Sequence, residues 1–98
     1  MKVVYSPRAT RDLETIAIYY RTVADPTISA AIAERIEYVI NRLGRLPHSA
    51  PRVVDRSGVR AALVLRYPYK IFYRVRGDAV EILHIRHTSR RPWSGESG

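Results

Sequence analysis

Basic and imidazole side chains with a spacing suited to phosphate chemistry gather in the second half of this 98-residue chain. Metal-free cleavage of RNA by its own 2′-hydroxyl needs a base, an acid, and cations that stabilise the charge developing on the phosphate. Lys70 and Arg74 lie four residues apart in one apolar run, and this even spacing should place them on the same face of a strand. Arg66 lies just before this run. His87 ends the next apolar run in phase with Lys70, and an imidazole is suited to proton transfer near neutral pH. These residues are the candidate catalytic set.

Each of these residues also has a structural interpretation. If Gly77-Asp78 forms a two-residue turn, Arg74 lies opposite Glu81 and pairs with it, an interpretation we favour over a catalytic role. His87 is equally suited to a hydrogen bond with the chain where it leaves the sheet. His84 is expected on the helix-facing side of the sheet, as a structural residue that is at least half-buried.

The charge balance is strongly basic. Seventeen Lys and Arg stand against nine Asp and Glu, giving a formal net charge of +8, and all the cations except Lys2 and Lys70 are arginines. Arginine is suited to bidentate pairing with phosphate or carboxylate, which favours a polyanionic or acidic partner. Charge spread over the surface for solubility explains the same numbers, so composition leaves both interpretations open.

Composition excludes several classes of protein and site. The chain has no cysteine, which rules out a disulfide scaffold, a thiolate zinc site and a cysteine nucleophile. Its histidines, His48, His84 and His87, lack the helical spacing of a metal motif, so neither a metal nor a cofactor is expected. No apolar run approaches the ~20 residues of a membrane span, and the N-terminal stretch has acidic residues where a signal peptide is apolar. We therefore expect a cytoplasmic protein with no membrane partner.

Two amphipathic helices are predicted after a short strand at residues 1–6. Ser6 has the side chain of an N-cap and Pro7 suits the first helical position, and apolar residues then recur with helical period as far as Tyr20. Asp25-Pro26 opens a second helix of the same period, with Gly44 placed as its C-terminal cap. Neither helix can bury its apolar stripe alone, so the two should form an antiparallel hairpin.

The period of the apolar residues then changes to two. A weak strand at 53–54 is followed by strong ones at 60–66, 69–76 and 79–86, the last two joined by a turn at 77–78. The resulting order β-α-α-β-β-β-β predicts an α+β domain over residues 1–91, with the helical hairpin packed on one face of a mostly antiparallel sheet, and a polar tail at 92–98. The predicted pairs are Val75 with Val80, Tyr73 with Ile82 and Ile71 with His84 on the helix side, and Arg74 with Glu81, Phe72 with Leu83 and Lys70 with Ile85 on the other.

Three strings of sequence carry a family resemblance over about residues 2 to 91. They are SPRATRDLETIAIYY, INRLGRLPHSAPRV and LRYPYKIFYRVRGDAVEILHIRHTSRRPW. In content, order and spacing they resemble the toxin half of the RelE/ParE toxin–antitoxin superfamily. The resemblance implies a small basic bacterial toxin of the plasmid-stabilisation type. It also implies a cognate acidic antitoxin that wraps across the sheet and the helical hairpin in a hetero-oligomer.

The resemblance allows two activities. RelE-like members cleave messenger RNA on the ribosome, whereas ParE-like members poison DNA gyrase and are not known as nucleases. The lysine-rich cluster of the RelE-like nucleases is absent from residues 48–60, where Asp55 is the only acid. We therefore predict a ParE-like, non-enzymatic toxin that acts on gyrase, with a metal-independent, ribosome-dependent mRNA endonuclease as the alternative. A non-toxic binding module of the same fold would explain the charge but not the resemblance.

Two groups of residues are predicted to contact partners. Phe72 and Leu83 should form an exposed apolar patch on the sheet face away from the helices, and such patches mark interfaces. Of the adjacent Tyr19 and Tyr20 at most one can be core; Tyr20 is assigned, with Phe72 and Leu83, to the antitoxin. A group of charged and aromatic residues near the C-terminus is assigned to the target. They are Arg90, Arg91 and Trp93.

Overall fold

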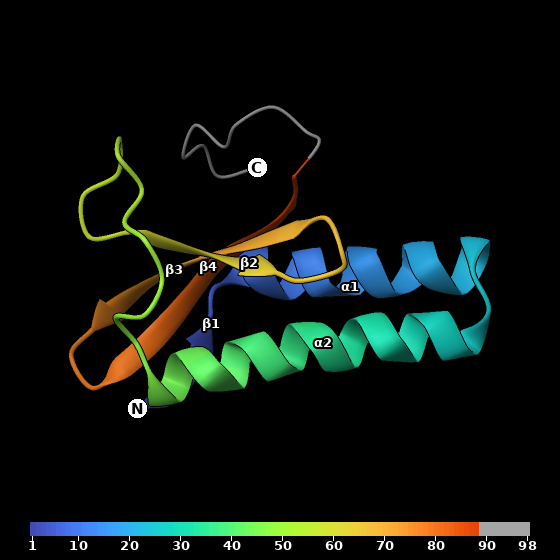
Figure 1. The fold of residues 1–98 in the computed structure, drawn as a ribbon, viewed down its shortest axis with the longest axis horizontal. Helices are drawn as coiled ribbons and strands as arrows, with labels where there is room; N and C mark the ends of the chain where they lie inside the picture. The colour runs from blue at the N-terminus through green and yellow to red at the C-terminus, as the bar shows by residue number, and fades with distance from the viewer. Residues whose placement is uncertain (89–98) are drawn as a thin grey trace.

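The computed structural model of the chain describes residues 1–88, which form a helical hairpin and a sheet packed against each other (Figure 1). The two helices lie side by side and antiparallel, and the sheet crosses them on one side. This arrangement confirms the predicted α+β class. The elements in chain order are β1 (Lys2–Tyr5), α1 (Pro7–Val23), α2 (Pro26–Arg45), β2 (Arg60–Val64), β3 (Tyr69–Arg76) and β4 (Ala79–His87).

Both helices begin where the sequence predicts. The Ser6 side chain accepts a hydrogen bond from the Ala9 amide at 3.0 Å, and Asp25 accepts one from the Ile28 amide at 3.0 Å. A proline follows each cap, where its missing N–H leaves no helical hydrogen bond unmade. The helix starts are therefore set by local sequence.

The end of α2 differs from the prediction because Gly44 is not its cap. The helix continues to Arg45, and Gly44 is buried in its last turn against β1. A Cβ built on Gly44 would lie 3.2 Å from both the Met1 carbonyl oxygen and Val3 Cγ2. Glycine is needed here because the β1 backbone approaches the helix closely.

The sheet is mixed, with strand order β1-β4-β3-β2. β1 runs parallel to β4, and the connection between these two neighbouring strands is long, consisting of the helical hairpin followed by β2 and β3. The other two pairings are antiparallel, as predicted. The weak strand predicted at 53–54 does not form, because only Arg52 makes an isolated bridge, to Arg60, and Val54 is 97% exposed.

A β-bulge changes the predicted register between β3 and β4. Near the turn the pairs Val75–Val80 and Arg74–Glu81 are as predicted, and so is Tyr73–Ile82. The next pair is Phe72 with His84, so Leu83 is an extra residue in β4 and every later pair is shifted by one. The corrected pairs are Phe72 with His84, Ile71 with Ile85, Lys70 with Arg86 and Tyr69 with His87.

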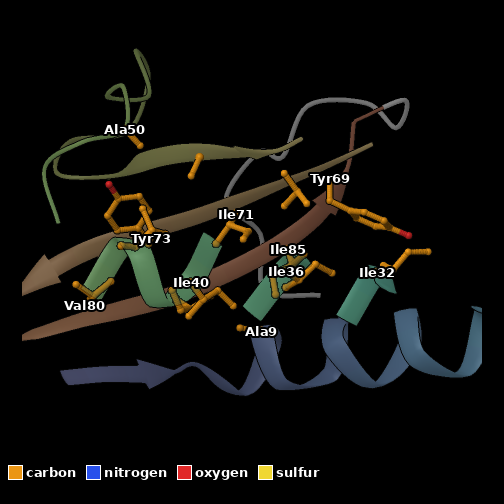
Figure 2. Close-up of a cluster of buried hydrophobic side chains, with 14 residues drawn as sticks. Ala9, Ile32, Ile36, Ile40, Ala50, Tyr69, Ile71, Tyr73, Val80 and Ile85 are labelled. Carbon is orange, nitrogen blue, oxygen red and sulfur yellow. The ribbon is translucent and has the colours of Figure 1, made fainter. Parts of the chain in front are cut away.

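The core lies between the sheet and the hairpin. The largest fully buried side chains, Ile71, Tyr73, Ile82 and Val80, come from β3 and β4, and the Tyr73 hydroxyl donates a hydrogen bond of 2.9 Å to the Pro47 carbonyl. This core holds β3 and β4 in place and so fixes which side chains they present on the far face. Figure 2 shows core residues of the sheet, Ile71, Tyr73 and Val80, on the side of the helices, where the buried stripe of α2 and Ala9 of α1 lie. The stripe of α2 consists of Ile32, Ile36 and Ile40.

Candidate partner-binding site

The sheet face away from the helices has an aromatic and cationic stack. The Phe72 ring stacks on His84 with centroids 5.9 Å apart and planes 16° apart, and the Arg86 guanidinium lies 5.8 Å from the Phe72 centroid. Phe72 is only 7% exposed, and Leu83 is half-buried within the bulge. The prediction of an exposed apolar patch is therefore wrong, because the bulge places the His84 imidazole opposite Phe72, where Leu83 was expected. The assignment of both residues to the antitoxin stays a prediction.

Arg74 forms the ion pair expected of it. Its Nε lies 2.7 Å from Glu81 Oε1, on side chains that are 41% and 23% exposed. A half-exposed pair of this kind contributes about 1 kcal/mol or less. The pair engages Arg74 with a neighbouring carboxylate in the free protein.

The structure does not assemble the candidate catalytic set. His87 lies opposite Tyr69, on the helix side of the sheet, so it does not share the face of Lys70 as predicted. The Tyr69 and His87 rings meet edge to face at 5.4 Å, and the Tyr69 hydroxyl donates to the Tyr20 hydroxyl at 3.2 Å. Arg66 lies in the exposed turn between β2 and β3. The bulge is the physical cause, because one extra residue in β4 moves His87 to the other face.

A partly buried carboxylate that the sequence analysis did not single out holds α1 to β4. Asp12 Oδ2 accepts the Ile85 amide at 2.9 Å and lies 2.6 Å from His84 Nδ1, while its Oδ1 accepts from Arg8 Nε at 3.2 Å. Because a carboxylate can only accept, His84 donates from Nδ1. The structural role and burial predicted for His84 are confirmed, but it lies opposite Phe72, on the other face from the one predicted. No local pattern marks this role of Asp12, since its two partners on β4 are more than 70 residues away in the chain.

The pKa of Asp12 is lowered from its ordinary value. Burial acts in the opposite direction by disfavouring the carboxylate. The hydrogen bonds from His84 and the Ile85 amide, together with the charge of His84 and a hydrogen bond from Arg8, outweigh burial. Asp12 is therefore a carboxylate at neutral pH, and it connects the first turns of α1 to the bulged part of β4.

A cationic hollow, here called the basic groove, lies between α2, residues 49–56 and strands β2 and β3, with a volume of about 900 Å³. Asp55 is the one acid among its lining residues, while Leu43, Leu63 and Phe72 contribute apolar surface. Cations beside apolar surface fit a partner segment that is acidic and amphipathic. The cations are Arg35, Arg42, Arg52, Arg56, Lys70 and Arg86.

A second hollow, here called the helix groove, lies between α1 and α2 and has a volume of about 590 Å³. Its lining is mostly apolar, with Ile16, Tyr20 and Ile36 from the helices and Arg21 and Glu37 as its charged residues. Tyr20 is half-buried here and packs against the core, so part of its ring is accessible to a partner. The helix groove is thus compatible with the role predicted for Tyr20, which stays a prediction.

Within residues 1–88, no group of three or more His, Asp or Glu side chains is placed to hold a metal ion. Neither helix in this part of the chain is long and apolar enough to cross a membrane. The residues assigned to the target lie outside the described part of the chain. They are Arg90, Arg91 and Trp93.

Two solved structures with this fold come from toxin–antitoxin systems. A chain of "Chromosomal ParDE TA system from P. aeruginosa" matches with a TM-score of 0.80 and 24% identity, over 91% of this chain and 97% of that chain. A chain of the toxin–antitoxin complex RelBE2 from Mycobacterium tuberculosis matches with a TM-score of 0.58 and 27% identity, over 88% of each chain. The fold is that of the RelE/ParE superfamily toxins.

The sequence narrows this class to one family. The family described as "ParE toxin of type II toxin-antitoxin system, parDE" matches residues 3–92, which is nearly the whole chain. The chain therefore belongs to the ParE toxin family of type II toxin–antitoxin systems, and the resemblance stated from its sequence strings is confirmed. No curated protein sequence matches it significantly.

Proposed function

We propose that this ParE-family toxin inhibits DNA gyrase and is held inactive by an acidic antitoxin. The observation that carries the choice of target is the separation of His87 from Lys70 on opposite faces of the sheet. A metal-free ribonuclease needs its acid and its phosphate-binding cations around one scissile bond. Arg74 is moreover engaged by Glu81 at 2.7 Å. A protein target places no such demand on the geometry.

The antitoxin half of the proposal rests on the two grooves. The basic groove offers six cations and one acid beside apolar surface, and the helix groove is mostly apolar. An acidic segment with an apolar stripe complements the basic groove in charge and both grooves in apolar surface. Apolar burial would contribute most of the affinity, so the complex should be tight and only modestly sensitive to salt. We place the resulting hetero-oligomer in the cytoplasm, where gyrase acts.

The experiment that tests the target compares two variants of the same chain. His87→Ala should weaken toxicity only partly, because His87 packs on Tyr69 rather than on the cationic face. Truncation after His87 removes the residues assigned to the target and should abolish growth inhibition while antitoxin pull-down is largely kept. Full toxicity of the truncated chain would contradict the assignment of Arg90, Arg91 and Trp93.

One observation favours the second candidate function, a ribosome-dependent mRNA endonuclease. Lys70 and Arg86 lie opposite each other on the sheet face away from the helices, where two cations could receive a phosphate. Under that reading, loss of a general acid reduces cleavage by ~10²–10⁴. Codon-dependent mRNA cleavage on translating ribosomes that is lost in His87→Ala would replace gyrase as the target.

A further inference from the structure

The turn between β2 and β3 contains a non-glycine residue in the left-handed backbone region. Arg66 has φ of 76°, and the other positive φ angles within residues 1–88 belong to Gly58 and Gly77. An L-residue with a long side chain adopts this region at a free-energy cost that glycine or asparagine largely avoids. Strain of this kind persists only where the surrounding structure holds it in place, and it is found most often at functional sites.

The backbone around Arg66 is fixed on its C-terminal side. Tyr67 packs against the core, and its carbonyl accepts the Tyr69 amide at 2.8 Å. The Pro68 carbonyl accepts the Thr88 amide at 2.7 Å. Arg66 is exposed, and within residues 1–88 no hydrogen bond or ion pair engages its guanidinium. The turn thus presents an arginine outward in a fixed place.

Two exposed leucines lie close to this arginine in the chain. Leu63 and Leu65 in and after β2 are 59% and 61% exposed, and Leu63 lies opposite Lys70 in the sheet register. We call these four residues the turn patch: Leu63, Leu65, Arg66 and Lys70. Exposed leucines beside two cations complement a protein surface that has carboxylates around apolar groups, because the guanidinium pairs with a carboxylate in bidentate fashion. A nucleic-acid backbone would match the cations but not the leucines.

We propose that the turn patch is a contact surface for the protein target of this toxin, with Arg66 pairing with a target carboxylate. Leu63, Leu65 and Lys70 also line the basic groove proposed for the antitoxin, so the two partners would compete for them, whereas Arg66 lies outside that lining. This inference rests on the proposed function, in which the target is a protein. It adds a second contact, within residues 1–88, to the C-terminal residues assigned to the target. Target binding supplies the reason for keeping arginine where glycine or asparagine would fit the backbone better.

The test replaces Arg66 with residues that suit its backbone. Arg66→Asn and Arg66→Gly should melt at or above the temperature of the wild-type protein, because both tolerate a positive φ. Each should need at least ~10-fold more protein to inhibit gyrase supercoiling, the loss typical of an interface anchor. Affinity for the cognate antitoxin should stay within ~3-fold, below the threshold of an anchor. Arg76→Asn, an exposed arginine at the β3–β4 turn, removes the same charge and should leave inhibition unchanged.

The outcomes separate this inference from the proposed function. If the wild-type chain inhibits gyrase and Arg66→Asn inhibits equally, the turn patch is not a target contact. An equal loss of antitoxin affinity would assign the patch to the antitoxin and overturn the inference. If the wild-type chain leaves gyrase untouched and cleaves mRNA instead, the proposed function fails. A loss of that cleavage in Arg66→Asn would then assign Arg66 to RNA and also overturn the inference.

Discussion

Replacing Asp12 with alanine should destabilise the fold more than any other change to a charged residue described here. The carboxylate joins α1 to β4 through His84 and the Ile85 amide, at 2.6 and 2.9 Å. Alanine leaves both donors without this acceptor, and an unsatisfied buried donor costs about 1–3 kcal/mol. The Arg8 pair along α1 adds only about 0.3–0.5 kcal/mol. The expected loss in the free energy of unfolding is about 3 kcal/mol.

Urea unfolding followed by circular dichroism measures this loss directly, with the denaturant slope expected to stay constant. For a chain of this size the same loss lowers the melting temperature by more than about 10 °C. The matched control is Glu14→Ala, an exposed acid on the same helix, which should change stability by less than about 0.5 kcal/mol. A loss below about 1 kcal/mol for Asp12→Ala would refute the reasoning.

The pH dependence gives the same prediction a second readout. Because the folded-state pKa of Asp12 is lowered, the carboxylate stabilises the fold fully above its unfolded pKa of about 3.9. That stabilisation is lost as the pH falls through the lowered pKa. The difference in stability between wild type and Asp12→Ala should therefore shrink as the pH falls below about 4. A difference that persists unchanged in acid would show that the charge of Asp12 plays no part.

Three further changes test the core, the ion pair between β3 and β4, and the close approach of β1 to α2. Ile71→Ala removes a side chain with no exposed surface and should cost about 2–5 kcal/mol in urea unfolding, with a smaller loss pointing to collapse of the cavity. A double-mutant cycle on Arg74 and Glu81 should give a coupling of about 1 kcal/mol or less, and loss of toxicity in Arg74→Ala alone would contradict its structural role. Gly44→Val should cost about 1–3 kcal/mol by overpacking against β1, and an unchanged melting temperature would show that β1 moves aside freely.

Sequence predicted the features that are decided within a few residues. The caps of both helices follow from Ser6-Pro7 and Asp25-Pro26, because each side chain bonds an amide three residues on. The β3–β4 turn and the pairs next to it follow from Gly77-Asp78 and the alternation of apolar residues. These contacts need no knowledge of the rest of the chain.

The bulge in β4 was not predictable because its cause is tertiary. Ser6 donates from its amide to the Ile82 carbonyl at 2.9 Å and from its hydroxyl to the Leu83 carbonyl at 2.8 Å. Asp12 then binds the Ile85 amide. The bulge lies where β4 passes from pairing with β1 to contact with the first turns of α1. Alternation alone assumes a regular ladder, so it placed every residue after Leu83 on the wrong face.

The change of register after the β4 bulge also determines how much of the candidate site was predictable. The Arg74–Glu81 pair precedes the bulge and is as expected, whereas His87 follows it and lies away from Lys70. Gly44 was assigned as a cap from its position near the helix end, and its contact with β1 depends on a strand more than 40 residues earlier. The cationic character of the groove was foreseeable from composition, but its location was not.

The central claim is tested most directly by adding purified toxin to a gyrase supercoiling reaction. We expect the wild-type chain to inhibit supercoiling, the cognate antitoxin to restore it, and the chain truncated after His87 to have no effect. Translating ribosomes incubated with the same preparation should keep their mRNA intact. Unimpaired supercoiling together with codon-dependent cleavage of that mRNA would contradict the account.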